Sequence, residues 1–209
     1  MSSHRIAGFF IQHVVFTFVV NQEQMKKTIF TVIATLLVIA IVFFIYIESG
    51  SYDISQTTPH NNLTKWVIRT TTHNSIDKRM DSVVVPSNLG DSSVIIEGFQ
   101  HYRSMCTMCH GAPGGRAEEM AMGLYPEPPL IYKHKGQEDP KEFFWIIKNG
   151  IKMTSMPAYG PTHADERIWA ITAFVTGKLN KMTPAEYAEW SKKYDQEEEM
   201  ESGKNEDKD

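Results

Sequence analysis

The longest apolar stretch of the chain is residues 28–47, from Thr28 to Ile47, which contains no charged side chain. At 1.5 Å per residue, a helix of this length is about 30 Å long, which matches the hydrocarbon core of a bilayer. Lys26 and Lys27 precede the run, whereas Glu48 and Asp53 follow it. The pattern predicts a transmembrane anchor, and the positive-inside rule places its N-terminus in the cytoplasm. In a bacterial inner membrane, the rest of the chain would then face the periplasm.

A cleavable signal peptide is the competing interpretation of this run. The apolar core of a signal peptide is usually about 7–15 residues long and ends in small residues, whereas this run is longer and residues 49–51 give only a weak cleavage signal. Upstream, residues 6–20 are mostly apolar but are interrupted by Gln12 and His13. Because Met25 and two lysines open the long apolar run like a translation start, we predict that residues 1–24 are absent from the mature protein.

Beyond the anchor, residues 48–92 form a linker in which apolar positions recur at near-helical intervals. These positions are Leu63, Trp66, Val67, Thr70, Ile76 and Met80. Four basic residues accompany them: Lys65, Arg69, Lys78 and Arg79. We predict an amphipathic helix over residues 61–80, followed by a connector over residues 81–92. Three interpretations stay open: a helix on the membrane surface, a helix docked on the following domain or on a partner, and a plain structural helix.

Helical periodicity dominates residues 93–180. Apolar side chains recur with this period over residues 93–105, 141–148 and 165–179, and Asn149-Gly150 is a good stop signal for the second segment. We therefore expect an all-α domain. The segment from Ala185 onward holds ten acidic residues and four lysines, a net charge of −6, although the whole chain is only −4. We predict a charged, disordered tail over residues 181–209, and a steering element for a basic partner is the alternative.

Both cysteines of the chain lie in one short motif, Cys106-Thr107-Met108-Cys109-His110. A Cys-x-x-Cys-His sequence is the attachment pattern of c-type haem, in which both thiols bond the porphyrin and the histidine becomes the proximal iron ligand. A structural zinc site needs four ligands, and no third cysteine exists. A thioredoxin-like dithiol would follow a buried strand, whereas a helical pattern precedes this motif. We therefore predict one haem c, bound through Cys106 and Cys109, with the redox dithiol as the alternative.

Several further motifs around the cysteines agree in order and spacing with a known family. They are Gly98-x-x-x-Tyr102 before the cysteines, Gly111-Ala112-Pro113-Gly114 after them, Pro128-Pro129-Leu130, and Met156-Pro157-Ala158-Tyr159-Gly160. With these motifs, residues 93–180 resemble a class I cytochrome c domain, similar to the single-haem domains of the cbb3-oxidase subunit III-like family. The resemblance implies about four helices around a covalent haem.

The resemblance also implies that Met156 is the distal ligand, so that His110 and Met156 hold the iron. Met153, three residues earlier, is the rival, and with Met105 and Met108 we expect it to serve packing instead. We expect His101, His134 and His163 to be solvated rather than bound to iron.

The family commonly uses a proline-rich carbonyl to orient the proximal histidine, for which Pro126, Pro128 and Pro129 are the candidates. In this family the last helix of the domain crosses the first. We therefore expect a close crossing at Gly98 in this chain, with Trp169 filling the contact.

These features predict a membrane-anchored electron-transfer protein, because His/Met ligation raises the reduction potential of haem iron. Its partners would be the membrane and redox proteins that give and take single electrons. The sequence shows no second haem motif, dinucleotide fingerprint or catalytic triad pattern, so we do not expect a self-contained enzyme. Two alternatives stay open: an obligate subunit of a larger oxidase or dehydrogenase, and a gas-binding sensor haem.

Overall fold

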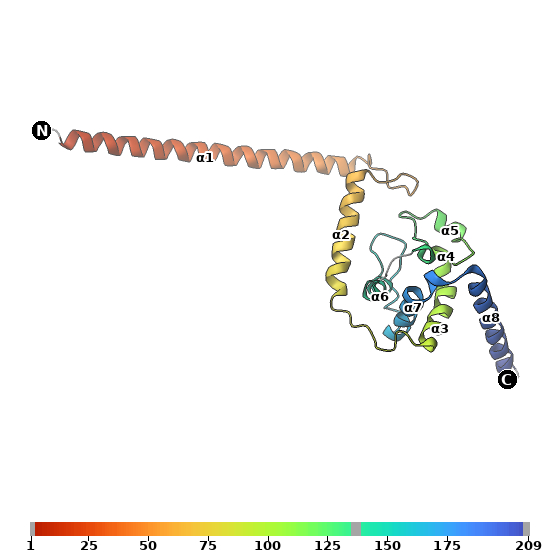
Figure 1. The fold of residues 1–209 in the computed structure, drawn as a ribbon. Helices are drawn as coiled ribbons and strands as arrows, with labels where there is room; N and C mark the ends of the chain where they lie inside the picture. Colours follow the sequence, from red (N-terminus) through yellow and green to blue (C-terminus); the bar gives the residue numbers. More distant parts are fainter. Residues whose placement is uncertain (1–2, 135–138, 207–209) are drawn as a thin grey trace. The chain divides into compact units, whose positions relative to one another are not determined.

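The computed structural model describes residues 3–134 and 139–206, and their side chains over residues 22–134 and 139–196. The chain divides into two compact units, Met1–Ser55 and Gln56–Asp209, which are described separately. All regular structure of the described residues is helical, without strands (Figure 1). This agrees with the predicted all-α class.

The first unit is dominated by α1 (Ser3–Glu48), a continuous helix. Within the described residues, one segment, Gln22–Glu48, is long and apolar enough to cross a membrane, judged by length and composition. This segment contains the expected anchor. The hydroxyls of Thr28, Thr31 and Thr35 donate to the carbonyl four residues earlier. The polar atoms of these threonines are therefore satisfied inside the helix, as an apolar surrounding requires. The suggestion that residues 1–24 are absent from the mature protein stays a prediction.

The second unit begins with α2 (Asn62–Met80). Asn61 is its N-cap, since the side-chain oxygen accepts from the backbone N–H of Thr64 at 2.9 Å. Lys78 and Arg79 lie in its last turn, where their positive charges interact favourably with the negative end of the helix dipole. Ile76 is its buried apolar residue, and α2 packs against α6 (Pro140–Asn149).

The core of this unit forms where α3 (Ser92–His101) crosses α7 (Asp165–Gly177). A β-carbon added to Gly98 would lie only 1.9 Å from the carbonyl oxygen of Ala170, so the backbones meet where only glycine fits. Phe99 and Phe174 lie beside this crossing and are fully buried, with ring centroids 5.4 Å apart. The prediction of a close helix crossing at Gly98 is confirmed.

Trp169 does not have the predicted partner. Its ring stacks on Phe144 of α6, with centroids 4.0 Å apart and an interplanar angle of 14°. Because Trp169 is one residue before Ala170, it points to a different side of α7 from the residue that meets Gly98. It therefore joins α7 to α6, while Phe174 fills the space beside α3.

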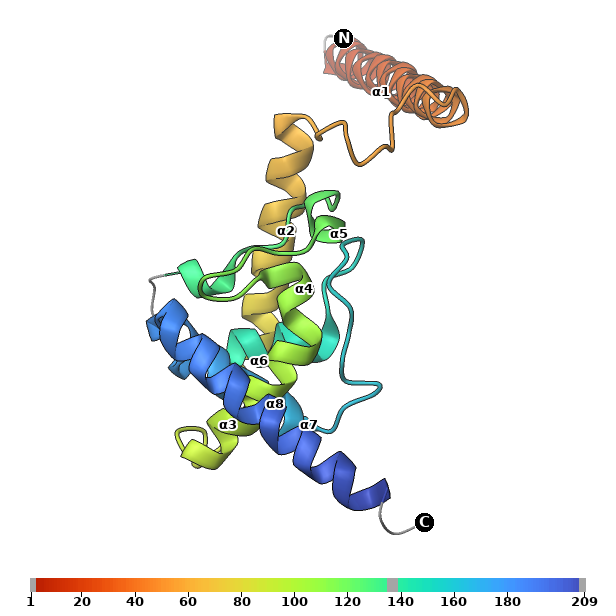
Figure 2. The same ribbon diagram turned by 90° about the vertical axis from the view of Figure 1, so that its right-hand side faces the viewer.

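The predicted disordered tail is wrong for most of its length. After a short 3₁₀ turn, η3 (Leu179–Lys181), the chain forms α8 (Pro184–Glu206), which runs in front of α3 in Figure 2. Tyr187 and Tyr194 are buried, and both rings contact Phe99, as does Trp190. The net charge of the segment hid this apolar face, which binds α8 to the core.

Candidate functional site

The cysteine motif follows α3 through a π-helical turn, η1 (Tyr102–Cys106), into the single turn of α4 (Thr107–His110). Cys106, Cys109 and His110 are spaced i, i+3 and i+4, which brings side chains to one side of a helical turn. All three are half-buried, and both thiols are free. Thr107 strengthens the turn, because its hydroxyl donates to the carbonyl of Arg103 at 2.8 Å.

One ring nitrogen of His110 already has a partner in the protein. Its Nδ1 lies 2.8 Å from the backbone carbonyl oxygen of Pro129, 19 residues later in the sequence. Since a carbonyl can only accept, Nδ1 carries the proton, and the lone pair of Nε2 is left for a metal. Among the three candidate prolines, Pro129 thus orients the ring.

The protonation of His110 also suits a metal ligand. Burial lowers the pKa of His110, and the hydrogen bond to Pro129 offsets this only in part. The imidazole is therefore held neutral, the form that binds iron.

Tyr102 fixes the backbone immediately after the cysteine motif. Its buried hydroxyl donates to the carbonyl of Gly111 at 2.8 Å, directly after His110. Burial raises the pKa of Tyr102, so the hydroxyl stays protonated and can donate. Gly111 has φ +64°, in the left-handed region, and a β-carbon there would lie 3.2 Å from the backbone nitrogen of Ala117. A side chain at this position would both strain the turn and crowd it.

Met156 lies on a loop that is pinned to the end of α6. The N–H groups of Tyr159 and Gly160 donate to the carbonyls of Ile147 and Lys148, at 3.1 and 2.9 Å. Gly150 ends the helix with φ +65°, and a β-carbon there would come within 2.8 Å of backbone atoms of three loop residues. These contacts hold the backbone of the loop against the helix end.

The two rival methionines differ in their surroundings. Met156 is half-buried and packs against the hydrophobic core, and its N–H donates to the hydroxyl of Thr154 at 3.1 Å. Met153 is 94% exposed and has φ +60°, so the expectation that it serves packing is wrong. Met105 does pack on the core, whereas Met108 is 39% exposed.

Tyr159 connects the Met156 loop with the cysteine motif. Burial, together with the neighbouring Cys106 and Cys109, raises the pKa of Tyr159. Tyr159, Met156 and Cys106 all pack against the same hydrophobic core. Burial and, to a smaller extent, Cys109 raise the pKa of Cys106 to about 12, so this thiol is protonated at neutral pH.

The three other candidate histidines differ in their surroundings, and the ring of His163 lies edge to face with Tyr159, with centroids 5.4 Å apart. His134 is exposed. His101 and His163 lie edge to face with ring centroids 6.4 Å apart, and His163 Nδ1 is 2.8 Å from the hydroxyl of Thr162. Burial, followed by the charge of Arg167, lowers the pKa of His101.

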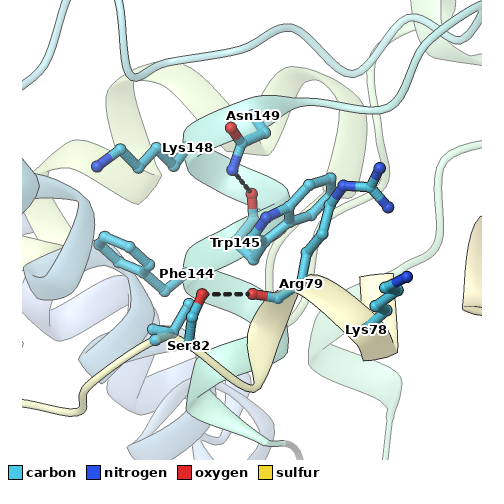
Figure 3. A pocket seen from close by; sticks show the side chains of 8 residues that line it. Lys78, Arg79, Ser82, Phe144, Trp145, Lys148 and Asn149 are labelled. Carbon is cyan, nitrogen blue, oxygen red and sulfur yellow. Dashed lines mark hydrogen bonds between the residues drawn. The ribbon is translucent and has the colours of Figure 1, made fainter. Parts of the chain in front are cut away.

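A hollow of about 530 Å³ lies between the end of α2 and α6 (Figure 3). Its lining residues are Lys78, Arg79, Ser82, Val83, Phe144, Trp145, Lys148 and Asn149. Lys148 is paired with Asp165 at 2.7 Å, and Arg79 donates to Ser75. None of the residues predicted to hold the haem lines this hollow.

Two free thiols, an imidazole with an available Nε2 and a thioether that packs against the same core as Cys106 form a donor set that fits a covalently bound haem. The fold and this set define a c-type cytochrome domain. In agreement, residues 94–175 match the family model for cytochrome c oxidase, cbb3-type, subunit III. These residues therefore form a cytochrome c domain of that family, a haem-based electron-transfer module; such a domain implies covalent haem c, and Cys106 and Cys109 have the spacing of its attachment motif. No curated protein matches the chain.

The match ends at Val175 and excludes α8, which nevertheless covers Phe99 in the core. Sequence reasoning missed this helix. Its signal was a capping pattern, in which the hydroxyl of Thr183 accepts from the N–H of Glu186, followed by aromatic residues on one helix face.

Proposed function

We propose that this protein is a membrane-anchored carrier of single electrons, with His110 and Met156 as the two axial ligands of one haem c. The observation that supports the proposal is the hydrogen bond from His110 Nδ1 to the carbonyl oxygen of Pro129, which orients the ring and leaves the lone pair of Nε2 available to bind iron. Bound haem supplies a ferric/ferrous couple, and a thioether ligand raises its potential by favouring the ferrous state.

The residues of this chain supply attachment, orientation and exclusion of water. Cys106, the last residue of η1, and Cys109 in α4 would hold the porphyrin, and Tyr102 fixes the turn that follows His110. Met156 is the better distal ligand because its half-buried loop is hydrogen-bonded to α6, while Met153 points into solvent. The apolar surroundings of the loop favour the neutral thioether over water as ligand.

The direct test compares optical spectra of the oxidised and reduced haem-loaded protein with those of Met156→Ala and Met153→Ala. We expect the wild type and Met153→Ala to show the weak long-wavelength band of methionine-bound ferric iron, and Met156→Ala to lose it. The midpoint potential of Met156→Ala should also fall. A band that survives in Met156→Ala would contradict this ligand assignment, and a protein that binds no haem would contradict the whole proposal.

We further propose that α1 anchors the protein, with the haem domain on the periplasmic side of a bacterial inner membrane. Support comes from the apolar segment Gln22–Glu48 and from the lysines that precede its uncharged part. Protease added to intact spheroplasts should cleave the haem domain. Protection until the spheroplasts are lysed would contradict this orientation.

A further inference from the structure

The two halves of α2 have different surroundings. Its second half joins the haem domain, where Ile76 is buried and Arg79 lines the hollow beside Trp145 (Figure 3). In its first half, Leu63 is 70% exposed and Trp66 is 64% exposed. Large apolar side chains are thus left in solvent on one half of a helix whose other half is packed.

Three of the four exposed large apolar residues in the first half of α2 share one helix face, on the side away from the domain, and Ile68 lies on another face. Leu63, Trp66 and Val67 are spaced i, i+3 and i+4, which places them on one helix face. Val67 and Ile76 are nine residues apart, which is half a turn out of phase at 3.6 residues per turn. Val67 therefore points away from the side on which Ile76 packs.

A second contact holds α2 to the domain at its other end. Just before its start, the ring of His60 lies edge-on to Tyr125, with centroids 5.4 Å apart. The domain therefore presents the free face of α2 in a defined direction and does not carry it on a loose tether.

Charge and chain connection indicate what covers this face. α2 carries Lys65, Arg69, Lys78 and Arg79 against a single acid, Asp77. A basic helix with exposed tryptophan and leucine suits the boundary of an anionic bilayer. The segment that links it to α1 is short, residues 49–61, and spans at most about 45 Å when fully extended.

We propose that the first half of α2 lies on an anionic membrane surface, with Leu63, Trp66 and Val67 inserted at the headgroup boundary. Because α2 is fixed to the haem domain, this contact sets the orientation of the domain relative to the bilayer. The inference rests on the proposed membrane anchor, and its test must therefore report on α1 and α2 separately.

Single spin labels on the full-length, haem-loaded protein make this separation. Haem attachment consumes both native cysteines, so a new cysteine is the only thiol. Labels are placed by Val67→Cys on the free face, Lys65→Cys on another face of the same turn, and Ile39→Cys in α1. Each protein is reconstituted into vesicles of phosphatidylcholine with phosphatidylglycerol, or of phosphatidylcholine alone. The accessibility of each label to oxygen, which partitions into lipid, is compared with its accessibility to a water-soluble nickel chelate.

The proposal predicts a several-fold higher oxygen-to-nickel ratio for the Val67 label than for the Lys65 label in the anionic vesicles, and a smaller difference in phosphatidylcholine. An unchanged haem spectrum controls for folding. If the Ile39 label is in lipid but the Val67 label has the same oxygen-to-nickel ratio as the Lys65 label, the anchor stands and the α2 proposal is overturned. A protein partner would then be the candidate that covers the free face of α2. Equal Val67 ratios in both lipids would overturn the requirement for anionic lipid. A wet Ile39 label would overturn the anchor, and the α2 proposal with it.

Discussion

The crossing of α3 and α7 gives a quantitative prediction for Gly98→Ala. The added β-carbon would lie 1.9 Å from the carbonyl oxygen of Ala170 and 2.9 Å from the β-carbon of Phe174. Real β-carbons essentially never approach other atoms within 3.0 Å, so the helices must separate by roughly 1 Å. The obstacle is a backbone carbonyl, which cannot rotate away as the end of a side chain could.

Overpacking of a core typically costs about 1–3 kcal/mol, and we expect this substitution at the upper end, at about 3 kcal/mol. That is a large part of the roughly 5–15 kcal/mol that stabilises a typical domain. The separation would also loosen the contact between Phe99 and Phe174.

The assay is guanidinium unfolding of the haem-loaded protein, followed by the haem absorbance. Gly177→Ala is the matched control, because Gly177 ends the same helix and its β-carbon would meet nothing within 4 Å. The control should change the free energy of unfolding by less than about 1 kcal/mol. If Gly98→Ala is no less stable than Gly177→Ala, the close crossing of α3 and α7 is refuted.

Three further predictions follow from the Met156 loop, from α8 and from the half-buried His101. Gly150→Ala should weaken the methionine–iron band without abolishing haem binding, because its β-carbon would push on the backbone of the Met156 loop; an unchanged spectrum would contradict this. Tyr194→Ala should lower the free energy of unfolding by about 3 kcal/mol, since it removes a buried ring beside Phe99, whereas a change within about 0.5 kcal/mol would mean that α8 does not contribute to the core. Burial lowers the pKa of His101 below 6.5, so the unfolded chain binds a proton more readily and stability falls as the pH drops below about 6.5. His101→Gln should flatten the dependence of unfolding free energy on pH between about 7 and 5, and equal slopes for the two proteins would exclude this role.

Local patterns sufficed for the features that depend on neighbouring residues. The helical spacing of apolar residues indicated α3, α6 and α7, and Asn149-Gly150 marked the end of α6. The cysteine spacing indicated haem c because the chemistry of attachment fixes that spacing.

Features that depend on long-range geometry could not be predicted from the sequence. Three prolines were equivalent as partners of His110 until the path of the chain brought the carbonyl of Pro129 to the ring. Trp169 was predicted to contact α3 but packs on Phe144 of α6. Its position within α7 does not determine which helix packs on each side of α7.

The tail shows a different kind of error. Averaging charge over the segment concealed the regular spacing of Tyr187, Trp190 and Tyr194, whose burial opposes the entropy of disorder. A hydrophobic pattern within a charged segment is therefore better examined by helix face than by composition.

The position of α8 orders events during synthesis of the protein. Arg103 pairs with Asp195, which is 92 residues later in the chain, and Phe99 likewise has to wait for Tyr187 and Tyr194. At roughly 5–20 residues per second, a nascent chain needs about 5–18 s to produce this interval. During that time the core beside Cys106 is still open on the side that α8 will cover. Closure of the core around Phe99 therefore depends on residues near the C-terminal end of the chain and is a late event in synthesis.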